Sequence, residues 1–420
     1  MSEFITPKKK SIMNNPFRLK LGKFLWGLSF YTPIITLYFL HHNVSLPAIV
    51  LSQVFYSIFS LVGNIPTGIL ADKLGKRQAL VLGYIFDVLG LSSMLFLPNV
   101  AGLFIAYSAL GFGDSFLSGS EEALMYESSE NKTIYRKNYG ALLANETLAF
   151  AAATLIAGIL TAWIGQPAYR LLILFTLLAD ALAACIALGL HNVISTHYAD
   201  ATEKPSNLDV LKQSVNVLWK SSIIRALAIV SLLTLSGEYF LYSVYQPYFI
   251  HNHVPAFFLG LVLSLGGLLN FVVMRYGYVL EKWLSLEKIL LLLNALMGLI
   301  YIAMAVFVSP IALVPLFIVL KGLFNSQMPI VSDYVNENTP DHIRATVLSS
   351  MSAVQSVGQI IARILLAIAV GAIGIGKTFE IQGFYMIAGI ALGYWLLVKC
   401  GCTHRIHRHH EESITEEVAT

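Results

Sequence analysis

Ionisable side chains fall inside several apolar stretches of this sequence, where little water is available to solvate a charge. At the centre of a lipid bilayer a charged side chain costs about 2.5–3.5 kcal/mol on insertion scales, so it needs a partner, water or a function. A buried carboxyl group can bind and release a proton, and a buried lysine or arginine can pair with it or bind an anion. These residues are Asp87, Asp114, Glu121, Glu122, Glu146, Asp180, Glu238, Lys321 and Arg363.

Their spacing groups many of these residues into polar stripes. Residues three or four apart share one face of a helix, and a polar face on an apolar helix is turned toward a partner helix or a water-filled cavity. We therefore expect each stripe to line a polar interior and not to face lipid. The stripes are Asp114, Ser118, Glu121 and Met125, with Glu122 beside them; Glu238, Tyr242, Tyr245 and Gln246; Lys321, Asn325 and Met328; and Ser352, Gln355, Ser356, Gln359 and Arg363.

The elements that position these stripes must be membrane helices. Of the 420 residues, 56% are hydrophobic and 12% are charged, and the mean hydropathy is +0.70. Such a chain has too few polar groups to coat a water-soluble globule of its size. Apolar runs of about 20 residues, long enough to cross roughly 30 Å of hydrocarbon, recur along it. We expect an all-α membrane protein with twelve transmembrane helices, near 21–41, 47–70, 79–98, 101–125, 140–165, 169–190, 223–250, 256–280, 288–308, 310–335, 345–373 and 379–399.

Basic residues cluster in the connections on one side of this predicted bundle. The opposite connections hold only Arg170 and Lys377. By the positive-inside rule both termini are expected in the cytoplasm. The net charge of +3 comes from these loops and needs no nucleic-acid partner. The clustered residues are Lys8, Lys9, Lys10, Arg18, Lys20 and Lys23 before the first helix, and Lys73, Lys76, Arg77, Lys132, Arg136, Lys137, Lys204, Lys212, Lys220 and Arg225 later.

The longest connection lies at the midpoint of the chain and divides it into two parts. Ser206 and Asp209 form a helix-start pattern, and the apolar residues between Leu208 and Trp219 share one face, which predicts an amphipathic helix at the membrane surface. A simple tether and a role in coupling the two parts both remain open. The predicted organisation is a cytoplasmic segment 1–20, a six-helix half 21–190, a linker 191–222, a second six-helix half 223–399 and a cytoplasmic tail 400–420.

A decapeptide of turn residues and charges, Gly68–Arg77, connects the second and third predicted helices. It resembles, position for position, the loop signature of the major facilitator superfamily of secondary transporters. A partial copy, Gly277–Lys282, follows the eighth predicted helix, which indicates two pseudo-symmetric halves and the rocking type of alternating access. We expect the first glycine to permit close helix approach, the second to permit the turn, and the aspartate to accept hydrogen bonds. The motif residues are Gly68, Asp72, Lys73, Gly75, Lys76 and Arg77.

In this superfamily the first, fourth, seventh and tenth helices line a central cavity, so the resemblance implies an acidic first half facing a basic second half. The alternative is that the charges only pair to hold helices together, and we favour that alternative for Asp87 and Asp180. The resemblance makes Asp114, Glu121, Glu122 and Glu238 the candidates for proton coupling. The candidates for contact with substrate are Tyr31, Tyr239, Tyr242, Gln246, Lys321, Asn325, Gln359 and Arg363.

Two further segments, Ser118–Ser128 and Arg344–Ser349, resemble a bacterial branch of multidrug or uncharacterised transporters. The chain departs from the drug–proton antiporters of the superfamily at two places. Tyr107 stands four residues before Gly111, where those antiporters carry arginine, and no Gly-Pro pair occurs between Tyr139 and Gly165. Any proton coupling would then depend on the acidic residues.

The tail contains cysteines and histidines at spacings that can bind a metal. Arginines and acidic residues interrupt them, so we favour a solvated tail and expect no metal and no cofactor. These residues are Cys400, Cys402, His404, His407, His409 and His410.

Together these patterns predict a monomeric secondary active transporter in the lipid bilayer, moving a small organic solute by alternating access. We expect a proton as the coupling ion and export as the direction. One alternative is transport of a metabolite or a siderophore-like metal chelate, indicated by Lys321, Arg363 and the histidines. Another is a transporter-like sensor that binds ligand without moving it. We do not expect an enzyme, because the dispersed charges form no clustered nucleophile and base.

Overall fold

The computed structural model describes residues 14–192, 222–281, 283–324, 326–337 and 341–399. This part of the chain is built from helices and turns, with no strand in it. The predicted linker helix and the Cys/His tail lie outside the described residues. Contacts divide the chain into two units, Met1–Lys204 with Phe249–Leu268, and Pro205–Tyr248 with Leu269–Thr420. Each unit is described by itself.

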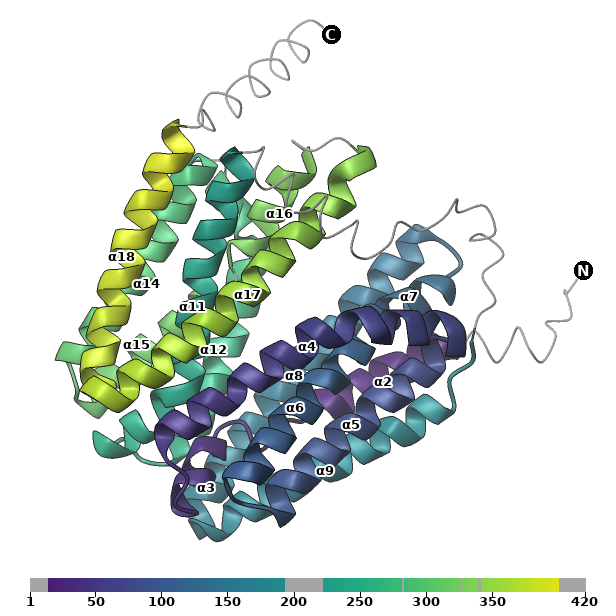
Figure 1. Cartoon of the computed structure of the whole chain (residues 1–420), viewed down its shortest axis with the longest axis horizontal. Coiled ribbons are helices and arrows are strands. Elements are labelled where there is room, and N and C mark those ends of the chain that lie inside the picture. Colours follow the sequence, from purple (N-terminus) through teal and green to yellow (C-terminus); the bar gives the residue numbers. More distant parts are fainter. Residues whose placement is uncertain (1–13, 193–221, 282, 325, 338–340, 400–420) are drawn as a thin grey trace, which may run out of the picture. The chain divides into compact units, whose positions relative to one another are not determined.

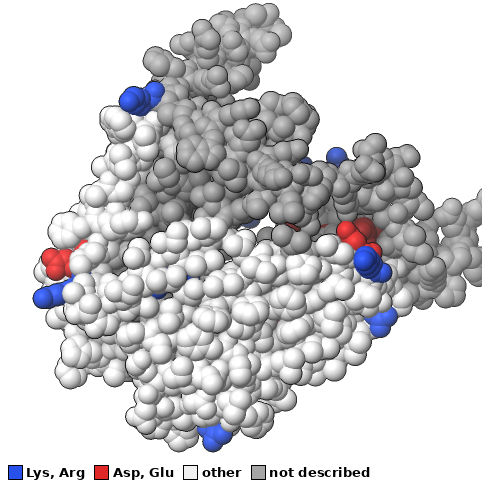
Figure 2. All heavy atoms as spheres, in the orientation of Figure 1, with Lys and Arg blue, Asp and Glu red and all other residues white. Residues whose placement is uncertain are grey.

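Nine helices of the described ranges are long and apolar enough to cross a membrane, and Pro310–Leu323 is a shorter apolar helix. Large apolar side chains lie exposed along them, for example Leu182 at 56% and Ile368 at 63% exposure. Figure 2 shows a surface that is largely uncharged, with few charged side chains on the face in view. An apolar surface of this extent fits contact with lipid. The prediction of a multi-span helical membrane protein is confirmed, and the count of twelve helices stays a prediction.

The first unit is a bundle in which helices distant in sequence pack side by side. Helix α5 packs against both α6 and α9, while α2 packs against α8 and α9, and α4 against α6 (Figure 1). The helices are α2 (Asn15–Gly27), α3 (Ile35–His41), α4 (Leu46–Leu74), α5 (Lys76–Phe96), α6 (Val100–Leu117), α7 (Ser120–Glu127), α8 (Lys132–Ile164) and α9 (Pro167–Leu188).

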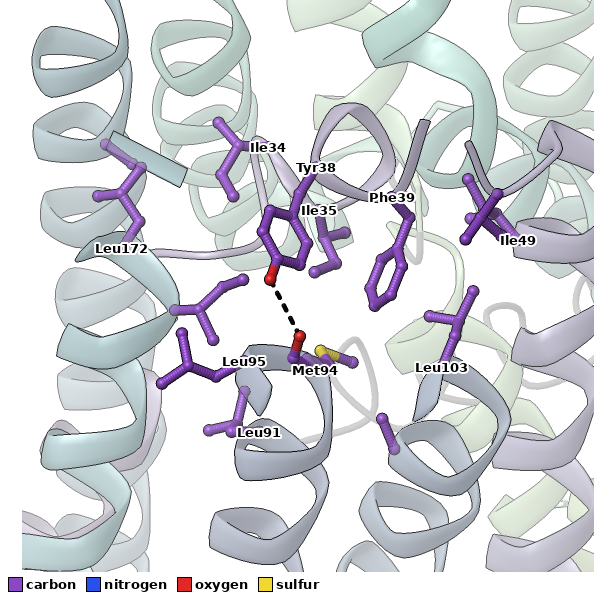
Figure 3. Close-up of a cluster of buried hydrophobic side chains, with 14 of the residues drawn as sticks. Ile34, Ile35, Tyr38, Phe39, Ile49, Leu91, Met94, Leu95, Leu103 and Leu172 are labelled. Carbon is purple, nitrogen blue, oxygen red and sulfur yellow. Dashed lines mark hydrogen bonds between the residues drawn. The ribbon is translucent and has the colours of Figure 1, made fainter. Parts of the chain in front are cut away.

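A cluster of buried apolar side chains holds α3 against the ends of α5, α6 and α9 (Figure 3). Tyr38 and Phe39 are almost fully buried in it, with 1% and 0% exposure. The Tyr38 hydroxyl donates a hydrogen bond of 3.1 Å to the main-chain carbonyl of Met94, drawn as the dashed line in Figure 3. A buried tyrosine needs such a partner, because an unsatisfied polar group in an apolar core costs free energy.

Two predicted helices of the first unit are interrupted. The first predicted span, 21–41, consists of α2 and α3 with a turn between them, and this turn contains Pro33, which has no N–H to continue a helix. The fourth predicted span is broken between α6 and α7, where Gly119 has a φ of 75°. Glycine adopts this left-handed conformation without the steric cost that other residues bear.

The second unit contains a further interruption. The tenth predicted span, 310–335, is broken after Leu323, so α15 and α16 are separate helices. Helix α14 packs against both α18 and α15. The helices after α9 are α11 (Ser222–His251), α12 (Phe257–Tyr276), α13 (Tyr278–Glu281), α14 (Leu286–Val306), α15 (Pro310–Leu323), α16 (Met328–Glu337), α17 (Asp341–Ile373) and α18 (Ile375–Lys399).

Helix bounds reveal an internal repeat with a shift of 210 residues. Helix α14 begins and ends 210 residues after α5 (286 minus 76, and 306 minus 96), and α15 begins 210 residues after α6 (310 minus 100). The Tyr248 hydroxyl donates a hydrogen bond of 2.7 Å to the carbonyl of Met304. Tyr248 and Met304 each lie 210 positions after Tyr38 and Met94, which form the same bond in the first unit. Asn43 and His253, with φ of 59° and 57°, are the positive-φ residues other than glycine in the described chain, and the same shift separates them. A duplication is therefore visible in local geometry, at a shift one residue longer than the 209 positions between Gly68 and Gly277, from which it was predicted.

Candidate functional site

A buried lysine with two glutamate partners lies inside the first unit. Lys23 comes from α2, and its Nζ atom lies 3.1 Å from Glu121 Oε2 of α7 and 3.5 Å from Glu146 Oε2 of α8. Lys23 and Glu121 are only 9% and 7% exposed. Charges removed from water in this way are costly unless they are paired and hydrogen-bonded. We call Lys23, Glu121 and Glu146 the lysine–glutamate cluster.

Aromatic side chains complete the surroundings of this cluster. The Tyr84 hydroxyl donates a hydrogen bond of 3.2 Å to Glu121 Oε1. The Lys23 ammonium also lies 4.0 Å from the ring centroid of Trp26, a cation–π arrangement that helps to replace its lost water. Trp26 Nε1 in turn donates a hydrogen bond of 2.9 Å to Asp87 Oδ2.

The cluster has one positive charge and two negative charges when all three groups are ionised. Two carboxylates therefore share one ammonium, and the cluster is not a one-to-one ion pair. The same geometry can also hold α2, α7 and α8 together, since each group comes from a different helix.

Lys23 was predicted to precede the first helix of the bundle, but the structure places it inside α2. Helix α2 begins at Asn15, six residues before the predicted start of the span, so Lys23 lies well inside it. The buried residues of α2 include Leu19, Lys23 and Gly27, one every four residues. The four-residue spacing places Lys23 on the same helix face as Leu19 and Gly27. This pattern in the sequence could have identified Lys23 as a buried residue.

The polar stripe predicted along the fourth span is divided by the break at Gly119. Asp114 remains on α6, where its Oδ2 atom accepts a hydrogen bond of 3.0 Å from Ser60 of α4. Glu121 lies on α7 in the lysine–glutamate cluster. Glu122 is exposed, and its Oε1 atom accepts a hydrogen bond of 2.8 Å from the Tyr135 hydroxyl. The structure thus places three of the proton-coupling candidates in three different environments.

The loop motif Gly68–Arg77 joins the end of α4 to the start of α5. Gly75 has a φ of 104° at the turn, as its predicted role required. Asp72, in the last turn of α4, pairs at 2.6 Å with Lys76, the first residue of α5. Gly68 has open space around it, since a Cβ there would meet nothing within 4 Å. Lys73 is exposed.

The same motif is tied to the end of α9. Arg77 donates a hydrogen bond of 2.7 Å from its side chain to the carbonyl of Leu188, and its main-chain N–H donates one of 2.9 Å to Asn192 Oδ1. Asn192 in turn donates a hydrogen bond of 2.7 Å to Gln78 Oε1. In this conformation the loop motif therefore contacts the end of α9 and the residues after it, which lead into the predicted linker.

The second unit holds its own charged cluster. Lys321 Nζ of α15 donates a hydrogen bond of 3.2 Å to Glu238 Oε1 of α11 and lies 5.2 Å from the ring centroid of Tyr242. The Arg363 guanidinium of α17 lies 4.0 Å from the ring centroid of Tyr239, which is next to Glu238. Lys321 and Arg363 are 7% and 5% exposed.

The other substrate-contact candidates lie in several places. Gln246 is buried one turn beyond Tyr242 on α11, and Gln359 lies half-buried one turn before Arg363 on α17. Tyr31 lies in the turn between α2 and α3 of the first unit, where its main-chain N–H donates to Thr176 Oγ1 at 3.4 Å. Asn325 lies outside the described residues.

Comparison with known families decides the class of this bundle. A sequence model of the Major Facilitator Superfamily matches residues 21–363. The chain belongs to the Major Facilitator Superfamily. YxaM of Bacillus subtilis (strain 168), an uncharacterized MFS-type transporter, is 21% identical over 374 residues, which cover 87% of this chain and 91% of YxaM.

Solved structures agree with this superfamily fold. The nucleoside transporter NupG matches with a TM-score of 0.73 at 15% identity, over 91% of this chain and 99% of its own. A D-xylose–proton symporter matches with a TM-score of 0.66 at 14% identity, over 92% of this chain and 97% of its own. At these identities the likeness shows the fold, and the superfamily places the chain among multi-span membrane transporters.

Metal ligands are not gathered in the described part of this superfamily member. Groups of three or more His, Cys, Asp or Glu residues able to hold a metal ion do not occur there. The tail histidines and cysteines, from Cys400 to His410, lie outside the described residues. The charged side chains of the two clusters engage instead in ion pairs and hydrogen bonds.

Proposed function

We propose that this chain is a proton-coupled secondary transporter that moves a small organic solute by alternating access. The observation that carries the proposal is the lysine–glutamate cluster, in which buried Glu121 and partly exposed Glu146 share the single ammonium of buried Lys23. A structural ion pair needs one carboxylate for one ammonium. A second carboxylate leaves a negative charge that a proton can neutralise.

The protonation step follows from this geometry. Ionised Glu121 attracts the Lys23 ammonium at 3.1 Å and accepts a hydrogen bond from Tyr84. Whichever of Glu121 and Glu146 binds a proton loses most of its attraction for Lys23, and the ammonium is left to the other. Since the three groups come from three helices, the exchange changes which helices are held together. Proton binding is thereby linked to the packing of α2, α7 and α8.

We propose that the second unit supplies substrate contacts through Lys321, Arg363 and the tyrosines beside them. Guanidinium and ammonium groups bind carboxylate and phosphate, and tyrosine rings stack on planar or apolar groups. A solute with an anionic group and a ring fits these contacts. The two buried cations also support the alternative of a metabolite or metal-chelate substrate.

The remaining parts of the proposal concern organisation. The segments 21–190 and 223–399 are the two bodies that move, as the 210-residue repeat of helix bounds supports. The loop motif and its contacts with Leu188 and Asn192 hold one conformation and break in the other. We favour a monomer in a bacterial inner membrane with cytoplasmic termini. Export is favoured through the resemblance of Ser118–Ser128 and Arg344–Ser349 to the multidrug branch.

Flux into proteoliposomes tests this proposal. The purified protein is reconstituted with a pH-sensitive dye inside the vesicles, and drugs, amino acids, nucleosides and metal chelates are added in turn. We expect one class of solute to move protons in the wild type, and the sidedness of the response gives import or export. Binding of a solute without any flux would support the sensor and overturn the transporter.

A further inference from the structure

A second pair of carboxyl groups lies between α5 and α9 of the first unit. Asp87 and Asp180 are 3% and 4% exposed, and Asp180 Oδ1 has no hydrogen-bond partner among the described residues. The charged group that acts on Asp180 in this part of the chain is Asp87. A carboxylate with a buried oxygen that lacks a donor bears a desolvation cost when it is ionised.

The groups around the pair do not neutralise it. Trp26 of α2 donates its indole N–H to Asp87, and Lys23 acts on Asp87 from the same helix. Lys23, the cation that acts on Asp87, already contacts two glutamates. The other titratable groups facing the pair are Tyr31 between α2 and α3, Tyr84 of α5, Asp114 of α6 and Glu121 of α7, while α8 contributes Glu146 to the same lysine.

Helix packing brings the two aspartates into the same part of the first unit, since α5 packs against α9. Thr176, one turn before Asp180 on α9, accepts a hydrogen bond from the main-chain N–H of Tyr31. The turn after α2 therefore contacts α9 one helical turn from Asp180.

We propose that Asp87 and Asp180 form a proton-binding site in which one of the two carboxyl groups keeps its proton. Both are buried on helices that pack against each other, and two carboxyls that share a low-dielectric interior resist being ionised together. Asp180 is that group, since Asp87 has the indole donor and the field of Lys23 to stabilise its charge. No bond other than that to the proton forms or breaks, and the proton returns to water when the pair becomes hydrated.

This inference rests on the proposed function for its role, because the retained proton becomes a coupling proton only if the chain transports. Trp26 joins the two acidic groups, with its ring beside Lys23 and its indole N–H on Asp87. Loss of the proton from Asp180 adds a second negative charge near Asp87. The electrostatic attraction between this pair and the Lys23 ammonium then increases. The pair therefore competes with Glu121 and Glu146 for the same cation.

Infrared spectroscopy tests the site without reference to transport. A protonated carboxyl gives a C=O stretching band that shifts in D2O, and we expect this band in wild-type protein in nanodiscs near neutral pH. The D180N variant keeps the size and polarity of the side chain, and the wild-type-minus-D180N difference spectrum should contain one such band. A protonated glutamate of the lysine–glutamate cluster absorbs equally in both proteins and cancels in this difference. Glu130→Gln is the matched control, because Glu130 is an exposed carboxyl between α7 and α8 and its difference spectrum should lack the band. A wild-type-minus-D180N difference without the band would overturn the proposal.

Flux measurements separate this inference from the proposed function. In proteoliposomes D180N should keep solute exchange in the absence of a gradient but lose accumulation driven by a pH gradient. Retained pH-driven accumulation in both D180N and D87N would refute a coupling role for the pair. If the wild type shows no proton-driven flux, the proposed function fails, and the infrared band alone decides whether the proton site exists. Melting temperatures confirm that each variant is folded, and Asp180→Leu provides a second uncharged variant if D180N does not fold.

Discussion

Replacing Lys23 by methionine removes the ammonium of the lysine–glutamate cluster and keeps a flexible apolar side chain of similar reach. Breaking a buried ion pair by removing one partner costs about 3–5 kcal/mol. Glu121 and Glu146 can limit this loss by binding a proton. Protonating an ordinary glutamate, with a pKa of about 4.3, costs about 1.4 kcal/mol for each pH unit above that value. The loss in the free energy of unfolding is therefore limited to about 3.7 kcal/mol at about pH 7 and about 1 kcal/mol at about pH 5.

The sign of the pH dependence follows from proton binding. The folded variant holds a proton that the unfolded chain releases, so its stability falls as the pH rises through this range. The measurement is the free energy of unfolding in micelles at both pH values for K23M and the wild type. Lys20→Met is the control, because Lys20 lies on the same helix and donates to the neutral amide of Asn138 at 3.2 Å. Equal losses at both pH values, or a loss in K23M no larger than in K20M, would refute the ion-pair interpretation.

Three further predictions concern single residues in either unit. Gly75→Ala should lower stability by about 1–3 kcal/mol, since its φ of 104° disfavours side chains; an unchanged melting temperature would contradict this. Tyr38→Phe and Tyr248→Phe each leave a buried carbonyl without its donor and should cost about 1–3 kcal/mol by chemical denaturation. A cost outside that range for one variant but not for the other would argue that the two hydrogen bonds are not equivalent in the repeat. Arg363→Lys keeps the charge but loses the planar stacking, so KM for the transported solute should rise while the melting temperature holds; an unchanged KM would exclude substrate contact.

The class of fold could be predicted from the sequence because it depends on local composition. Apolar runs of membrane length and the loop motif Gly68–Arg77 indicated the helical bundle and the superfamily. The partial copy at Gly277 predicted the duplication, which the matching bonds of Tyr38 and Tyr248 show in atomic detail. Each of these signals lies within one helix or one turn.

The candidate site was harder to predict because its partners come from distant parts of the chain. Lys23 was assigned to the cytoplasm, since the start of α2 could not be located from hydropathy alone. The stripe through Asp114 and Glu121 assumed one straight helix, and the positive φ of Gly119 separates them. Asp180 and Asp87 lie 93 positions apart (180 minus 87), and no spacing rule relates them. Helix periodicity identifies faces but does not identify which faces meet.

The most direct test of proton coupling through the lysine–glutamate cluster is proton movement on addition of a transported solute. The dye-loaded proteoliposomes are compared for wild type and E121Q, with solute exchange measured in the same vesicles. We expect the wild type to move protons with the solute, and E121Q to exchange solute while moving no protons. Proton movement in E121Q equal to that of the wild type would show that the coupling proton does not bind at Glu121.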